Sequence, residues 1–369
     1  MHILKTVPLV LVIIVLLVVV IFFVITNGPT FGKLPSGERL ERIKKSPNYR
    51  DGAFQNLEDT PAITSDDSML KIMLSGIFNK VKDRSPKEAF HFTKQNLKEI
   101  PTSENVLVWM GHSSYYLQVD GKRMLIDPVF SGYSSPFSFM VKAFKGSDLY
   151  TPDDIPSLDY LFISHDHWDH LDYKTVKAIF PKVRKVITGL GTGAHLEHWG
   201  LEKEKLTELD WGEATDLDPG FHVTGETARH FSGRSIKRNQ AIWMSFVLKT
   251  PSSKIYLGGD SGYGKHFKAI GDHYGPFDLV ILENGQFSEN WKHIHMLPGE
   301  HVMAMKDLRS TTLLPVHNSK FDLAQHSWKE PMSTLIQDTV SGIKILTPQI
   351  GEKLDWKNSK TNPWWEGQK

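Results

Sequence analysis

The chain has 369 residues and a formal net charge of +1, with 43 Lys and Arg against 42 Asp and Glu. This length allows one large domain with a sizeable core plus additional segments. Because the charges are balanced and spread along the chain, we expect no nucleic-acid partner. The chain contains no cysteine, which excludes disulfides and thiolate ligands, so a metal would have to be held by the 17 histidines and by carboxylates.

The amino terminus carries an unbroken apolar run from Leu9 to Ile25. As a helix this run would extend for about 26 Å, which predicts a transmembrane anchor over residues 1–26. A signal peptide is the alternative, but its apolar core would be unusually long and no small-residue cleavage pattern follows it. The basic residues after the run favour a cytoplasmic domain by the positive-inside bias. We therefore expect a single-pass membrane protein.

Three further regions follow the predicted anchor. Residues 27–60 are rich in Gly, Pro, Lys and Arg with little periodicity, which predicts a juxtamembrane linker. Residues 61–105 form a predicted helical lead-in, because the apolar side chains from Met69 to Val81 have helical spacing behind Asp67 or Ser68 as a helix cap. Residues 106–369 form the main domain.

Strands that alternate with amphipathic helices predict an α/β domain in which helices cover the sheet. The pattern leaves open one covered sheet or two sheets face to face. A hairpin turn is expected at Asp120-Gly121. The predicted strands are 106–110, 115–119, 122–126, 160–163, 185–188, 221–224, 242–248, 254–257, 279–282, 312–316 and 343–346. The predicted helices are 173–180, 193–199, 265–272, 299–308 and 330–337.

The run from Ser164 to Asp172 reads SHDHWDHLD and follows a short apolar stretch typical of a buried strand. It brings His165, His167, Asp169 and His170 together on one loop. Three imidazoles and a carboxylate suit Zn²⁺ better than Mg²⁺ or Ca²⁺, which prefer an oxygen shell. On a tight loop the first two histidines point to one side and the last two ligands to another, a geometry that serves two adjacent metals.

Three later residues complete the predicted ligand set. Each of His230, Asp260 and His317 is the first polar residue after a run that looks buried or nearly so. Ligands that converge from several strand ends are a common way for a sheet to build a metal centre. The set therefore comprises seven side chains.

These residues carry a resemblance to a known family. The pattern His-x-His-x-Asp-His, followed by a single His, a Gly-Asp and a late His, resembles the metallo-β-lactamase superfamily. The segments WMGHSS (109–114), LIDPVF (125–130), GDSGY (259–263), GPFDL (275–279) and HMLPGE (295–300) are similar to the branch of N-acyl-phosphatidylethanolamine-hydrolysing phospholipases D. The similarity runs from about Val106 to about Leu354, and the chain departs from the branch at ENGQF (283–287).

The resemblance implies an αββα sandwich with two Zn²⁺ at one edge. It assigns the first ion to His165, His167 and His230 and the second to Asp169, His170 and His317, with Asp260 between them. A metal-bridging hydroxide would cleave a phosphodiester, with N-acyl-phosphatidylethanolamine or a related phospholipid as substrate. Asp169, Asp260 and His295 are the expected catalytic residues, and His295 would position the substrate or assist the leaving group.

Several neighbouring side chains have two interpretations. Asp127 is either a hydrogen-bond partner of a ligand imidazole or a turn residue before proline. His112 supports a ligand or the turn that contains it. Arg229, Arg234 and Arg238 either bind phosphate or lie exposed.

Two other functions fit the same residues. A lactone or amide hydrolase would use the same hydroxide on a carbonyl carbon. A zinc-binding interaction module would bind metal without turnover. Oligomeric state cannot be derived from the sequence.

Overall fold

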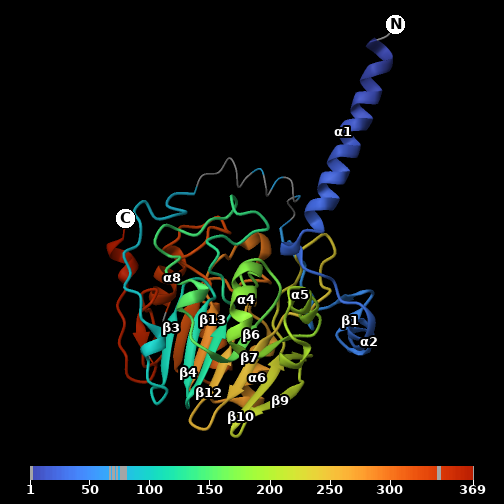
Figure 1. Ribbon diagram of the computed structural model, residues 1–369. Coiled ribbons are helices and arrows are strands. Elements are labelled where there is room, and N and C mark those ends of the chain that lie inside the picture. Colours follow the sequence, from blue (N-terminus) through green and yellow to red (C-terminus); the bar gives the residue numbers. More distant parts are fainter. Residues whose placement is uncertain are drawn as a thin grey trace.

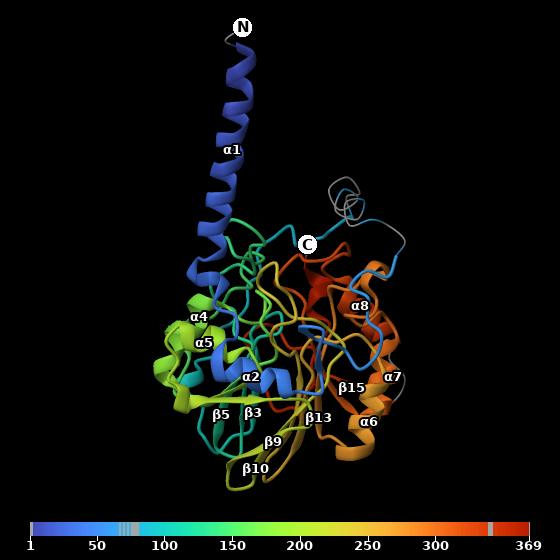
Figure 2. The same ribbon diagram turned by 90° about the vertical axis from the view of Figure 1, so that its right-hand side faces the viewer.

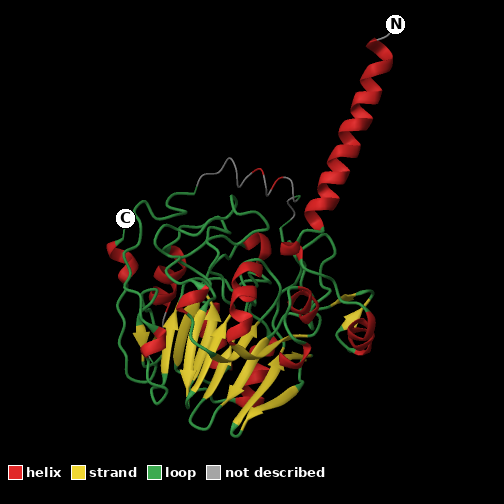
Figure 3. Ribbon diagram, viewed as in Figure 1, coloured by secondary structure: helices red, strands yellow, loops and turns green. Residues whose placement is uncertain are grey.

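The computed structural model describes residues 3–65, 68, 71, 74, 81–338 and 342–368. Its centre consists of two seven-stranded sheets, and helices lie outside them (Figures 1 and 3). A separate two-stranded hairpin, β1 (Tyr49–Arg50) and β2 (Ala53–Phe54), precedes the sheets. The αββα sandwich implied by the resemblance is therefore confirmed.

The first sheet has the strand order β16-β3-β4-β5-β6-β7-β8. Strands β5 to β8 run parallel, whereas β16, β3, β4 and β5 pair antiparallel. The predicted hairpin turn is confirmed, because Asp120 and Gly121 have φ values of 47° and 77°. The strands are β3 (Val106–Trp109), β4 (Tyr115–Val119), β5 (Lys122–Ile126), β6 (Leu158–Ile163), β7 (Val183–Gly189), β8 (Leu206–Leu209) and β16 (Lys353–Leu354).

The second sheet has the order β15-β14-β13-β12-β11-β10-β9 and repeats this design. Strands β12 to β15 run parallel, and β9 to β12 pair antiparallel. The strands are β9 (Ala214–Asp218), β10 (Phe221–Glu226), β11 (Ser245–Lys249), β12 (Lys254–Leu257), β13 (Leu279–Glu283), β14 (Thr312–Val316) and β15 (Lys344–Ile345).

Apolar side chains fill the space between the sheets and beneath the helices. A central cluster joins Phe162 of the first sheet to Phe246 of the second, whose rings lie 5.2 Å apart. Helices α4 (Tyr173–Ile179) and α5 (Gly193–His198) pack on the first sheet. Helices α6 (Lys265–Tyr274), α7 (Glu300–Asp307) and α8 (Glu330–Asp338) pack on the second, so that strands separate the two sets of helices (Figure 2).

The prediction of an N-terminal transmembrane anchor is wrong. Residues Ile3–Thr26 do form a helix, α1, which projects from the domain (Figure 1). However, within the described part of the chain no helix combines the length and apolar character that a membrane crossing requires. The structure therefore does not support the predicted single-pass topology or the cytoplasmic placement that was derived from it.

The segment predicted as a linker, residues 27–60, is instead folded against the domain. It contains the short helix η1 (Pro29–Phe31), helix α2 (Gly37–Lys45) and the β1–β2 hairpin. Ile43 and Phe54 are fully buried in the central cluster. Arg39 of α2 binds Glu197 and Glu208, at 2.7 Å each. The predicted lead-in helix near Ser68–Val81 lies almost wholly outside the described residues.

Candidate metal centre

The predicted metal-binding loop, Ser164–Asp172, connects β6 to α4. A tight turn in its middle is closed by the amides of His170 and Leu171, which both donate to the carbonyl of His167. Asp172 ends the loop as the cap of α4, because its side chain accepts from the amide of Lys174. The loop is therefore fixed at both ends by regular structure.

The other predicted ligands reach the same edge of the sandwich from the second sheet. Asp260 follows β12, and His317 directly follows β14. His230 lies in the connection from β10 to β11. Because β5, β6, β12 and β14 all end at this edge, side chains from both sheets meet there. The structure brings all seven predicted ligands together and leaves none outside.

One group of ligand atoms consists of His165, His167 and His230, whose nitrogens lie within 4.8 Å of one another. Nε2 of His165 is 2.8 Å from Nδ1 of His167, and Nε2 of His230 is 3.2 Å from the same atom. Three imidazole nitrogens converging on one point form a tripod typical of a zinc site.

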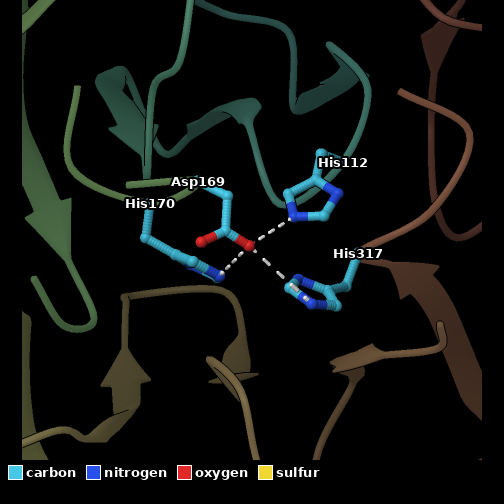
Figure 4. A group of neighbouring side chains, drawn as sticks. All are labelled: His112, Asp169, His170 and His317. Carbon is cyan, nitrogen blue, oxygen red and sulfur yellow. Dashed lines mark hydrogen bonds and ion pairs between the residues drawn. The ribbon is translucent and has the colours of Figure 1, made fainter. Parts of the chain in front are cut away.

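A second group consists of Asp169, His170, His317 and, in addition, His112 (Figure 4). Oδ2 of Asp169 is 2.8 Å from Nε2 of His112, 3.6 Å from Nε2 of His170 and 4.0 Å from Nε2 of His317. Asp260 lies between the two groups, 3.1 Å from Nε2 of His170 and 3.7 Å from Nε2 of His230. Asp260 also forms groups with His165 and His170 and with His230 and His295, so the possible ligand sets overlap and the division between two ions stays a prediction.

Hydrogen bonds to the far side of each ring orient the imidazoles. Nδ1 of His230 donates to the carbonyl of Ile294 at 2.9 Å. Nδ1 of His317 lies 2.9 Å from Oγ of Ser113. Nδ1 of His170 lies 2.9 Å from Oδ2 of Asp127, so the predicted contact of Asp127 with a ligand imidazole is confirmed. His170 and His230 are left with Nε2 facing the centre, whereas Nδ1 of His317 also lies 3.1 Å from Oδ1 of Asp260. Outer partners of this kind orient ligand rings around metal sites.

Three of these residues hold a backbone conformation that is unusual for residues other than glycine. His112, Asp127 and His317 have φ values of 52°, 42° and 66°. Residues in the left-handed region are strained, and such strain collects at functional sites. Here it turns the chain sharply where a strand or turn must present its side chain to the centre.

The charge states of the side chains at the centre favour the binding of a cation. Burial lowers the pKa of His165, His230 and His317 well below the usual value, so these rings are neutral and keep a lone pair. Burial opposes the ionisation of Asp260, but the imidazoles around it, His170 first, outweigh burial and hold its pKa well below the usual range. Burial likewise opposes protonation of His170, yet Asp260 and Asp169 raise its pKa.

Two buried atoms at the centre, Nε2 of His170 and Oδ1 of Asp260, make no hydrogen bond to any described residue. Each has one ion-pair contact of 3.1 Å, with Oδ2 of Asp260 and Nδ1 of His317 respectively. Because buried polar atoms are normally hydrogen-bonded, a cation held between such donors would satisfy them. Imidazole and carboxylate donors suit a divalent transition metal.

His295, predicted from the resemblance, lies beside the centre on the connection from β13 to α7. Its ring centroid is 5.1 Å from those of His230 and His317. On its other side Nδ1 is 3.5 Å from Oε2 of Glu283, a fully buried carboxyl at the end of β13. Burial raises the pKa of Glu283 to about 7, while Glu283 raises that of His295.

The centre opens into a cavity of about 280 Å³. It is lined by ligand residues together with apolar side chains, among them Ile63, Phe231, Trp291 and Ile294. An adjoining cavity of about 480 Å³ is mainly polar and includes Arg50. Arg238 lines both cavities.

The three arginines considered as phosphate ligands have different environments. Arg229 donates to Thr60, Asp59 and Tyr263, which ties it to the folded N-terminal segment. Arg234 is buried and bonded to carbonyls. Only Arg238 of the three lines the cavity at the metal centre.

Two residues have a larger part in the site than the sequence indicates. His112, which the sequence predicts to support either a ligand or its own turn, lies 2.8 Å from Asp169 and could itself be a ligand. Glu283 stands out in the sequence only within a segment that departs from the family. The signal for His112 was present, since it precedes Ser113-Ser114 between two strands that end at this edge. Nothing local marks Glu283, because a buried carboxyl at a strand end depends on its neighbours.

Comparison with known proteins identifies the superfamily. A family model described as a β-lactamase superfamily domain matches residues 122–318. An uncharacterised protein of Mycobacterium tuberculosis is 36% identical over 333 residues, which cover 87% of this chain and 88% of the relative. The N-acyl-phosphatidylethanolamine-hydrolysing phospholipase D 1 of Caenorhabditis elegans is 30% identical over 231 residues, 57% of this chain and 62% of the relative.

Solved structures agree at the level of the fold. The isothiocyanate hydrolase from Delia radicum gut bacteria superposes with a TM-score of 0.54 at 20% sequence identity. The match covers 68% of this chain and 98% of that structure.

Proposed function

Because the chain belongs to the metallo-β-lactamase superfamily of metal-dependent hydrolases, we propose that it is a dinuclear zinc enzyme that cleaves a phosphodiester bond of a phospholipid. The proposed substrate class is N-acylated phosphatidylethanolamine, with phospholipase D-type cleavage. Relatives that are named as N-acyl-phosphatidylethanolamine-hydrolysing phospholipases D support this choice.

One observation carries the proposal: the cavity at the centre combines two groups of ligand atoms with apolar walls and an arginine. The paired groups fit two ions, and two ions stabilise both the attacking and the leaving oxygens of a phosphodiester. Apolar side chains such as Trp291 and Ile294 suit an acyl chain, and the guanidinium of Arg238 suits the phosphate. An amphiphile with a phosphodiester matches both kinds of surface.

Each ligand then has a proposed role. His165, His167 and His230 would hold one ion, Asp169, His170 and His317 would hold the other, and Asp260 would complete the ligand set. When bound, divalent ions act as Lewis acids and lower the pKa of the attacking water. Asp169 and Asp260 keep the site anionic enough to hold the two cations, which is why they are the proposed catalytic carboxylates.

His295 is proposed to serve the leaving group. As water attacks phosphorus, the bond from phosphorus to the alcohol oxygen breaks, and that oxygen needs a proton. Oε2 of Glu283 lies 3.5 Å from Nδ1 of His295, which leaves Nε2 of the ring as the edge for the leaving group. Nε2 would donate the proton to the alcohol, which departs as the N-acylethanolamine while phosphatidic acid remains.

The test uses the full-length protein loaded with zinc and a panel of phospholipids that includes N-acyl-phosphatidylethanolamine. We expect two zinc ions per chain by elemental analysis, and phosphatidic acid as a product by mass spectrometry. The variant His317→Ala should lose turnover. The matched control is His222→Ala, which removes a histidine on β10 that pairs with Asp216 away from the centre.

Failure would be informative. A protein that holds two metals but releases no phosphatidic acid would contradict the phospholipid proposal. Turnover of lactones or amides by the same protein would assign the alternative carbonyl chemistry to the centre.

A further inference from the structure

Residues 29–33, called the strap below, lie between α1 and α2 and touch the metal-binding loop. The edge of the Phe31 ring packs on Trp168 of that loop, with centroids 5.2 Å apart. The carbonyl of Pro29 accepts from Nε1 of Trp199 at 2.7 Å. The amide of Lys33 donates to Nδ1 of His195 at 3.0 Å. The strap is therefore bonded to the elements that flank the loop as well as to the loop itself.

Arg234 joins the strap to the loop from within. Its side chain is buried, and Nη1 donates to the carbonyls of Asp166 at 2.8 Å and Leu171 at 2.6 Å, the first within the run of ligands and the second directly after it. Nε and Nη2 donate to the carbonyl of Thr30 at 3.1 and 2.9 Å. The guanidinium lies 3.9 Å from the Trp168 ring centroid. The guanidinium of Arg234 thus contacts both the loop and the strap.

A second set of hydrogen bonds connects the strap to the loop through His195. Because Nδ1 accepts from the strap, Nε2 carries the proton and donates to Oδ2 of Asp166, 3.3 Å away. The other oxygen of Asp166 accepts from the amide of Gly233 at 2.6 Å. Asp166 stands between the ligands His165 and His167, so its anchoring fixes the backbone of both.

The approach of the strap is close enough to require glycine. Gly32 has a φ of 70°, and a Cβ placed there would lie 2.1 Å from Nδ1 of His195. Without the strap, Nε and Nη2 of Arg234 would lose their acceptor while remaining in a buried pocket, which is unfavourable for a charged group. The loop would have to shift so that water could reach the guanidinium.

We propose that the strap holds the metal-binding loop in its ligand geometry, with Arg234 and His195 as positioning residues that link the two. The N-terminal segment before the main domain would then be part of the metal centre. The inference rests on metal binding by the loop and is independent of which substrate is cleaved.

Cobalt(II) binding to the full-length protein tests the proposal. Gly32→Ala should weaken binding by about 10- to 100-fold, the range usual for loss of a partner outside the ligand set, and should change the visible spectrum of the bound cobalt. Gly37→Ala is the control for an alanine at positive φ: Gly37 has a φ of 58°, but the added Cβ meets no atom within 4 Å. Its affinity and spectrum should equal those of the unmodified protein.

A second variant provides an independent test in case Gly32→Ala does not fold. Trp199→Phe removes the hydrogen bond to Pro29 but keeps an aromatic ring, and it should weaken cobalt binding in the same direction. Circular dichroism identifies any variant that does not fold. Unchanged affinity and spectrum in the folded variants would overturn the role of the strap. An unmodified protein that bound no cobalt would overturn this inference and the metal centre together.

Discussion

At the scale of single residues, several predicted ligand imidazoles are oriented by a contact on the side that faces away from the centre. Asp127 is the clearest example, because its two oxygens bind His170 and both the amide and the hydroxyl of Ser164. One carboxylate thereby fixes a ligand ring and the first residue of the loop. Partners of this kind set the tautomer and the orientation of the ligand.

We expect Asp127→Asn to reduce zinc affinity by about 10- to 100-fold, because an amide is a poorer acceptor for the His170 proton. Competition with a chelator of known affinity measures the change. Asp216→Asn, at a carboxylate that contacts His222 on the surface, is the control and should have no effect. Equal zinc affinity of Asp127→Asn and the unmodified protein would contradict this role.

Glu283 is predicted to act through His295. In Glu283→Gln the ring loses its anionic partner, so turnover of a lipid with a poorly leaving alcohol should fall by about 10- to 100-fold, while zinc content stays the same. A diester of p-nitrophenol needs no proton on its leaving group and should be cleaved with little loss. Comparison of kcat for the two substrates gives the result. An equal loss for both would show that Glu283 supports the fold and not the leaving group.

At the scale of elements, the strand ends were predictable and the N-terminal elements were not. A buried apolar run followed by a polar residue marks Asp260 and His317 in the sequence alone. No such pattern predicts the position of helix α2 against the domain. That position depends on ion pairs of Arg39 with Glu197 and Glu208, which are distant in sequence. The apolar run of α1 predicts a membrane anchor, and no helix in the described part of the chain meets the requirements for a membrane crossing. Strands β8 and β9 are not predicted because their short, partly exposed sequences contain no run of apolar residues.

The docking of α2 makes a prediction about stability. Ile43 has no exposed surface, so Ile43→Ala should lower the free energy of unfolding by about 2–4 kcal/mol. Ile336→Ala on α8, where the side chain is 40% exposed, should cost much less. Chemical denaturation of both variants measures the difference. A loss of less than about 0.5 kcal/mol at Ile43 would mean that α2 does not belong to the core.

Helix α7 makes the stability depend on pH. Burial lowers the pKa of His301 to about 4, against about 6.5 for an unfolded histidine. Above pH 6.5 the ring is neutral in both states; below it the unfolded chain takes up the proton first, so stability falls until the folded pKa is reached. Between pH 7 and 4.5 this group should remove about 2–3 kcal/mol.

The effect of His301 can be isolated with His301→Gln. Denaturation at pH 7 and pH 4.5 should show a smaller loss in this variant than in the unmodified protein, both freed of metal. Equal losses would show that His301 is accessible to protons in the folded state.

At the scale of the whole molecule, two sheets of the same design bring their strand ends to one edge, and the ligands come from both. Neither sheet holds a complete centre, since the loop after β6 supplies His165 to His170 while β12 and β14 lead to Asp260 and His317. Metal binding should therefore join the two halves of the sandwich. The strap in the N-terminal segment contacts the metal-binding loop at the same edge.

The most direct test of the proposed reaction is hydrolysis of N-acyl-phosphatidylethanolamine by the zinc-loaded protein in ¹⁸O-labelled water. Attack at phosphorus breaks the bond to the ethanolamine oxygen, so the account predicts one labelled oxygen in the phosphatidic acid and none in the N-acylethanolamine. Label in a released fatty acid, with no labelled phosphatidic acid, would show attack at a carbonyl carbon and would contradict the phosphodiester assignment.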